Sequence, residues 1–125
     1  MLFDTDILIW YLRGNPKAAK IIQDTVAKQI STVVYMELLQ GARDKREVKV
    51  IRTFLKDAGF EILPLTENIG HRASVYMEEY CLKTGMCMAD ALLASTAVEN
   101  QLPLITGNSK HYKTITEVEL RIFRP

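Results

Sequence analysis

Short apolar runs alternate along the chain with longer amphipathic stretches. Five apolar runs predict brief strands, at 1–3, 29–32, 60–64, 103–106 and 119–123. Six amphipathic or apolar stretches predict helices, over 7–12, 16–28, 33–43, 45–58, 66–83 and 88–99, and a helical turn is expected at 108–112. The alternation predicts an α/β fold with three α/β/α layers, in which helices cover both faces of a central, mostly parallel sheet of four to five short strands.

Size and composition predict one ordinary globular domain over residues 1–125. The chain is 48% hydrophobic and 25% charged, which is typical of soluble domains. The longest early apolar run, residues 7–12, is too short to cross a membrane and is preceded by acids rather than basic residues. Cys81 and Cys87 make neither a disulfide framework nor a zinc ligand set and are expected to be buried, small apolar residues. A cytoplasmic protein without membrane association is expected.

Two acids follow the first predicted strand almost at once. Asp4 and Asp6 stand between apolar runs, where an unpaired charge is costly to desolvate. They could act as N-caps of the helix over 7–12, which explains one acid better than two. Ligands of parallel α/β sheets bind at the carboxyl ends of the strands, and Asp4 and the segment 106–108 both fall at such ends.

Two further acids lie in strongly apolar helical stretches. Glu37, in "STVVYMELLQGA", could face solvent on a narrow stripe with Gln40 and Asp44, or face inward. Asp90, in "MCMADALLASTAVE", is the only charged residue between 86 and 94, and it could instead cap a helix beginning at 91. Carboxylates gathered in one pocket raise one another's pKa, and a divalent cation reverses that penalty. Oxygen ligands without His or Cys favour Mg²⁺ or Mn²⁺, which suit phosphate substrates.

These motifs resemble those of PIN-domain ribonucleases, most closely the VapC-type toxins of toxin–antitoxin pairs. The resemblance covers nearly the whole chain and includes "LFDTDILIWYL", "STVVYMELLQGA", "MADALLASTAVEN", "LPLITGN" and "NSKHY". It implies a PIN-like domain that cleaves RNA phosphodiester bonds with Mg²⁺ or Mn²⁺. It further implies a homodimer and a small VapB-like antitoxin that covers or enters the acidic pocket.

The resemblance also assigns roles to residues. Asp4, Glu37 and Asp90 would bind the metal, and Asp6 and Asn108 would orient ligands and waters. Thr106 would hydrogen-bond the phosphate or a ligand. Asn108 stands where many family members have a fourth acid, which leaves one metal ion or two as open alternatives.

Charge is compatible with an RNA substrate once the inward acids are set aside. The net charge is +1, but with Asp4, Asp6, Glu37 and Asp90 around a metal, sixteen basic residues face eleven acids. Basic residues at 13, 17, 43, 45, 46 and 110 could rim the pocket or simply be solvated. Trp10, Tyr11 and Tyr112 could stack on bases but more often such residues are core, and neither His71 nor His111 lies inside the acidic motifs.

Two other functions fit the sequence less well. A haloacid dehalogenase-like phosphatase also opens with Asp-x-Asp, but it requires Gly-Thr after the second Asp where this chain has Ile7-Leu8. A catalytically degenerate PIN domain that binds RNA or a protein partner without cleavage is favoured by Asn108. Measuring Mg²⁺ or Mn²⁺ binding separates this alternative from the nuclease.

Overall fold

A five-stranded parallel sheet forms the centre of the molecule. The computed structural model describes residues 1–125. The strands are β1 (Leu2–Phe3), β2 (Lys28–Ser31), β3 (Phe60–Leu63), β4 (Leu104–Thr106) and β5 (Leu120–Ile122). Their order is β3-β2-β1-β4-β5, and all four pairings are parallel. The predicted parallel sheet is therefore confirmed, and the last short run joins it as a parallel edge strand.

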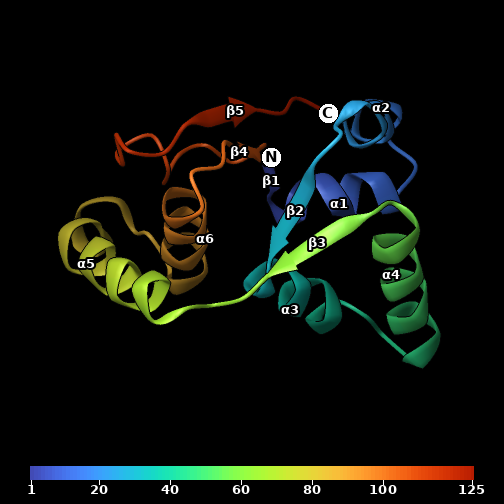
Figure 1. Cartoon of the computed structure of the whole chain (residues 1–125), viewed down its shortest axis with the longest axis horizontal. Helices are drawn as coiled ribbons and strands as arrows, with labels where there is room; N and C mark the ends of the chain where they lie inside the picture. Colours follow the sequence, from blue (N-terminus) through green and yellow to red (C-terminus); the bar gives the residue numbers. More distant parts are fainter.

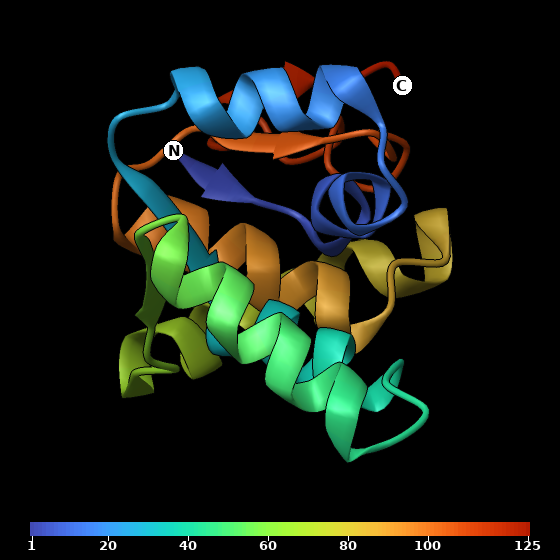
Figure 2. The ribbon, with the colours of Figure 1, turned by 90° about the vertical axis from the view of Figure 1, so that its right-hand side faces the viewer.

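Six helices surround this sheet (Figure 1). They are α1 (Thr5–Leu12), α2 (Pro16–Asp24), α3 (Thr32–Gln40), α4 (Lys45–Asp57), α5 (Glu67–Thr84) and α6 (Met88–Glu99). Helices α5 and α6 lie on one side of the sheet and α1 and α4 on the other, as Figures 1 and 2 show from two directions. This arrangement confirms the predicted three layers.

Capping residues explain most of the helix boundaries. Asn15 accepts from the Ala18 amide and Pro16 occupies the first turn of α2. Helix α2 ends at Asp24 rather than near 28, because Thr25 turns to an extended backbone and the chain must reach the sheet at Lys28. Gly85 ends α5 with φ of 75°, a conformation that favours glycine. The predicted turn at 108–112 is a single turn, in which Ser109 O accepts from Tyr112 N and Lys113 N.

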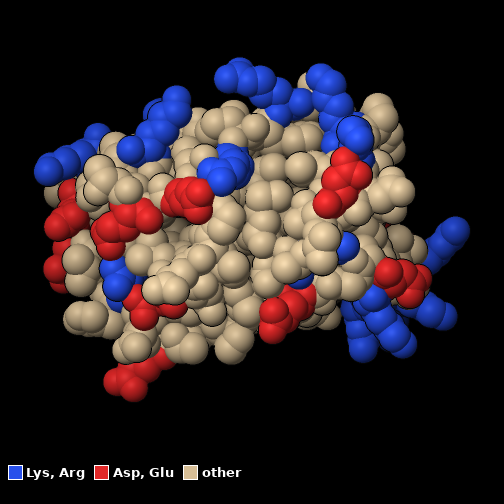
Figure 3. All heavy atoms as spheres, turned by 45° about the horizontal axis from the view of Figure 1, so that its top comes forward, with Lys and Arg blue, Asp and Glu red and all other residues tan.

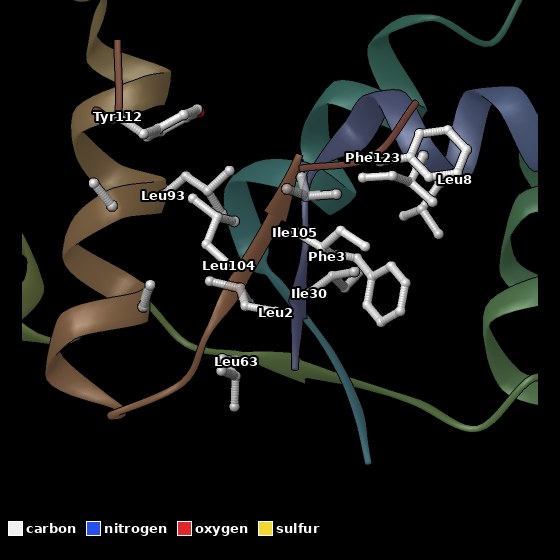
Figure 4. Close-up of a cluster of buried hydrophobic side chains, with 14 of the residues drawn as sticks. Leu2, Phe3, Leu8, Ile30, Leu63, Leu93, Leu104, Ile105, Tyr112 and Phe123 are labelled. Atoms are coloured by element: carbon white, nitrogen blue, oxygen red, sulfur yellow. The ribbon is translucent and has the colours of Figure 1, made fainter. Parts of the chain in front are cut away.

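The core lies on both faces of β1 and β4. Leu2, Phe3, Leu104 and Ile105 are buried in neighbouring strands, and Figure 4 shows them between Leu93 of α6 on one side and other apolar side chains on the other. Because both faces are covered, these strands are continuous apolar runs.

Strand order identifies the place where a ligand site is expected. From β1 the chain builds outward through β2 and β3, then returns past β1 to β4 and β5. The direction reverses between β1 and β4, and open α/β sheets bind ligands outside the carboxyl ends of strands at such a switch point.

Candidate active site

Asp4 lies at the switch point, directly after β1. Phe3 is in register with Ile105, and Asp4 N donates to Ile105 O at 3.0 Å, so Asp4 stands beside Thr106 at the end of β4. Its Oδ1 accepts from the Thr5 amide at 2.7 Å and its Oδ2 from the Thr106 hydroxyl at 2.8 Å. Asp4 is thus the N-cap of α1 and also joins the ends of the two central strands.

Asp6 is held by the loop that follows β4. Its Oδ2 accepts from Gly107 N at 2.8 Å, while its Oδ1 is buried without a hydrogen-bond partner. A Cβ on Gly107 would lie 2.6 Å from Asp6 Oδ2. Glycine is therefore required here by the close approach of the Asp6 carboxylate.

Glu37 reaches the same end of the sheet from α3. Ser31 caps this helix by accepting from Val33 N at 3.1 Å, which starts α3 directly after β2. The Glu37 side chain is exposed, as its solvent-facing interpretation required, and its Oε1 accepts from the Thr5 hydroxyl at 2.7 Å. Thr5 thus lies between Glu37 and Asp4 and bonds to both.

Asp90 is fixed in the first turn of α6. Its Oδ1 accepts from the Tyr112 hydroxyl at 3.1 Å. Its Oδ2 accepts from Cys87 N at 3.3 Å and lies 3.1 Å from Cys87 Sγ. The helix begins at Met88, which confirms the predicted range and excludes the alternative start at 91, although Asp90 does cap the helix by reaching back to Cys87. Cys87 is exposed and Cys81 half-buried, so the prediction of buried cysteines is wrong, although both are free.

Burial and mutual repulsion perturb the acids of this cluster. Burial raises the pKa of Asp4 to about 7, the charges of Asp6 and Glu37 add to the effect, and the bond from Thr106 opposes it. Burial also raises the pKa of Asp6, which the Gly107 amide partly offsets. The pKa of Tyr112 is raised by burial and then by the charges of Asp4 and Asp90. The Tyr112 hydroxyl therefore lies close enough to Asp4 and Asp90 for both carboxylates to disfavour its ionisation.

The carboxylates of Asp4, Asp6, Glu37 and Asp90, here called the acidic cluster, suit a hard divalent cation by the type of their ligand atoms and by their charge. All the ligand atoms that it offers are oxygens, and a cation would relieve the repulsion that contributes to the raised pKa of Asp4. In the observed side-chain positions, however, no three His, Cys, Asp or Glu residues form a group that could hold a metal ion. The carboxylates instead accept hydrogen bonds from Thr5, Thr106 and Tyr112. Binding of one cation by three of these acids therefore requires side chains to move from the observed positions.

Some of the other residues predicted from the sequence lie beside Thr106 or Glu37, and others do not. Asn108 N donates to the Thr106 hydroxyl at 3.0 Å, while its side chain is exposed. Arg13, Arg43 and Arg46 line a groove of about 700 Å³ with Glu37, between α1, α3 and α4. The basic residues Lys17, Lys45 and Lys110 do not line this groove.

Most of the aromatic and histidine candidates are core or surface residues and make no contact with the acids. Trp10 and Tyr11 pack against the core, and Tyr11 stacks on Phe54 with ring centroids 4.4 Å apart. Tyr112 is more deeply buried, with 2% of its surface exposed, and its hydroxyl reaches Asp90. His71 is exposed and His111 half-buried.

Sequence reasoning missed the residues that support the acids. Thr5, Cys87 and Gly107 each hydrogen-bond a carboxylate through a group that is common in any helix cap or turn. Two sequence features could have identified them as partners of the acids: Thr5 stands between two acids, and Gly107 directly follows Thr106. The sequence predicts Tyr112 as a core or base-stacking residue, and only its hydroxyl distinguishes it from an apolar aromatic residue.

Comparison with known proteins identifies the family of this chain. Residues 1–116 match the family described as "PIN domain". The chain is 29% identical to Ribonuclease VapC1 of Methanocaldococcus jannaschii, over 98% of this chain and 86% of that protein. It is 29% identical to Ribonuclease VapC19 of Mycobacterium tuberculosis, over 94% and 96%. A toxin–antitoxin complex from Klebsiella pneumoniae contains a chain of 30% identity with a TM-score of 0.79, covering 94% of this chain and 93% of that one. With the acidic cluster at its switch point, this chain belongs to the PIN domain family.

Proposed function

We propose that this protein is a Mg²⁺- or Mn²⁺-dependent endoribonuclease that acts as the toxin of a toxin–antitoxin pair. The observation that carries the proposal is the gathering of acids from distant segments at the switch point, where Asp4 is repelled by Asp6 and Glu37. Relatives named as ribonucleases over nearly the full chain support RNA as the substrate.

The chain's own residues would prepare the site for phosphodiester hydrolysis. Asp4, Glu37 and Asp90 would hold the cation, with Thr106 orienting Asp4 and Tyr112 orienting Asp90. When bound, such an ion lowers the pKa of water beside the scissile phosphate and offsets charge on the phosphoryl oxygens. The Gly107 amide would keep Asp6 directed at the site as a support for ligands or water.

Asp90→Asn tests the proposal directly, because the variant keeps the size of the side chain and removes its charge. Cleavage of total RNA in Mn²⁺ should be lost, EDTA should stop the wild type, and excess Mn²⁺ should restore it. Asp57→Asn is the control, since Asp57 is exposed at the end of α4. Wild-type rates in Asp90→Asn, or activity that persists in EDTA, would contradict the assignment.

A cleavage-deficient PIN domain is the alternative, and Asn108 in place of a fourth acid is the feature that favours it. Calorimetric titration with Mg²⁺ and Mn²⁺ distinguishes the two functions. Binding that Asp4→Asn abolishes supports the nuclease, whereas absence of any binding supports the degenerate protein.

Partners and location remain predictions. A VapB-like antitoxin that covers the acidic pocket is supported by the resemblance to a chain of a toxin–antitoxin complex. A homodimer and a cytoplasmic location are proposed on the family resemblance alone. None of the helices combines the length and apolar character needed to span a bilayer.

A further inference from the structure

One face of α4 carries four cations that have no anionic partner. Lys45, Lys49, Arg52 and Lys56 are exposed, and none takes part in an ion pair of the structure. At 100° per residue they fall within about 60° of the helix circumference, along about 16 Å of its axis. Like charges at these spacings destabilise a helix. The four side chains therefore form a local concentration of uncompensated positive charge.

The stripe forms one wall of a groove that also offers aromatic surface. The groove measures about 920 Å³, and Tyr35 of α3 and Phe60 of β3 lie among its lining residues, both half-buried. No acidic residue lines it, whereas three acids line the neighbouring groove that contains Glu37. Figure 2 shows α4 on the outer surface, and in Figure 3 Lys and Arg side chains project on the side where α4 lies. Cations beside aromatic rings are the combination that binds single-stranded nucleic acid.

The groove is separate from the acidic cluster. Tyr35 and Glu37 are two residues apart on α3, which places them about 200° apart around the helix. A polymer that occupied both places would therefore pass around α3 or α4. RNA has the length to do so, and its phosphates supply the negative charge that the stripe lacks.

We infer that the groove between α4 and β3 binds a single-stranded stretch of the substrate RNA, away from the nucleotides that enter the acidic cluster. The inference rests on the proposed ribonuclease function for its choice of polyanion. Tyr35 and Phe60 would contact bases while the α4 cations contact phosphates.

The test uses a triple variant, Lys49→Gln, Arg52→Gln and Lys56→Gln, made in the Asp90→Asn background. Fluorescence anisotropy in EDTA measures binding of labelled poly(U) of about 30 nucleotides, longer than a typical single-strand site. A matched control removes three exposed cations that line neither groove, with Lys17→Gln, Lys83→Gln and Arg124→Gln. Thermal unfolding should show no loss of stability in the triple variant, because the change removes repulsion between like charges.

Salt dependence gives the decisive number. Loss of three phosphate contacts should lower the slope of log K against log salt by about 2. Between about 50 and 200 mM salt, the ratio of the two dissociation constants should then change about 20-fold. The control should keep the parent's slope. An unchanged slope in the triple variant, or an equal loss in the control, overturns the inference.

Two further measurements separate the possible failures. Poly-L-glutamate that displaces poly(U) as well as unlabelled poly(U) does would overturn the assignment to RNA and favour an acidic protein partner. Cleavage of total RNA by the wild type in Mn²⁺ is measured in parallel. If the wild type does not cleave but the slope change is seen, the proposed function fails and the binding groove stands.

Discussion

Replacing Asp4 by Asn should stabilise the protein at alkaline pH when no divalent cation is present. Asn caps helices as well as Asp does, and its amide nitrogen can donate to the Thr106 hydroxyl, from which Asp4 Oδ2 accepts in the wild type, so the charge is the main loss. The pKa of Asp4 is raised in the folded protein, so the folded state holds its proton more tightly than the unfolded state. Wild-type stability therefore falls as pH rises from about 4 to about 7, and the loss is complete above that range.

The size of the effect follows from the same comparison. A pKa raised from 3.8 to about 7 corresponds to an upper limit of about 4 kcal/mol at pH 8. Because Asp4 is only half-buried, water screens part of this penalty, and we expect about 1–2 kcal/mol. Against a total stability of about 5–15 kcal/mol, such a difference is readily measured.

Urea unfolding followed by circular dichroism, in EDTA at pH 4 and pH 8, measures this difference. Asp4→Asn should match the wild type at pH 4 and exceed it at pH 8. Millimolar Mg²⁺ should close the gap by binding the folded wild type. Glu78→Gln is the control, because Glu78 is exposed on α5. A gap of the same size at both pH values would refute the proposed repulsion at Asp4.

Two further predictions concern the residues that support the acids. Tyr112→Phe removes the hydroxyl that donates to Asp90 and should lower cleavage in Mn²⁺ about 10-fold, with about 1 kcal/mol lost in urea unfolding; unchanged cleavage would show that Asp90 needs no such partner. Gly107→Ala places a Cβ 2.6 Å from Asp6 Oδ2 and should lower cleavage at least 10-fold without altering the circular dichroism spectrum. Gly70→Ala, where a Cβ meets nothing within 4 Å, should leave cleavage unchanged.

The sequence predicts the fold well because its signals are local. Buried parallel strands must be short apolar runs, and Asn15, Pro16, Ser31 and Gly85 mark helix ends through their own backbone chemistry. The early end of α2 was not predictable in this way. It depends on where β2 pairs with β3, a contact between segments distant in sequence.

The acids of the site were also identifiable, because unpaired charges in apolar surroundings stand out. Asp90 is the clearest case, since no other charge occurs near it on α6. What the sequence does not contain is the pairing of each acid with its donor. The contact between Asp4 and Thr106 joins residues 102 positions apart, and that between Asp6 and Gly107 joins residues 101 apart. Such pairs follow from strand order, which local patterns leave open.

The donors around the acids explain how this site can exist before a cation binds. A structural zinc site supplies folding energy, and its protein unfolds without metal. Here the Thr106 hydroxyl, the Gly107 amide and the Tyr112 hydroxyl already satisfy carboxylate oxygens. A hydroxyl can rotate to another acceptor, whereas the Gly107 amide is fixed by the backbone. Asp4 Oδ2 and Asp90 Oδ1 can thus exchange a hydroxyl partner for a cation, while backbone amides hold Asp6 and the other oxygen of Asp4 and of Asp90. Removal of metal should therefore abolish activity without unfolding the chain.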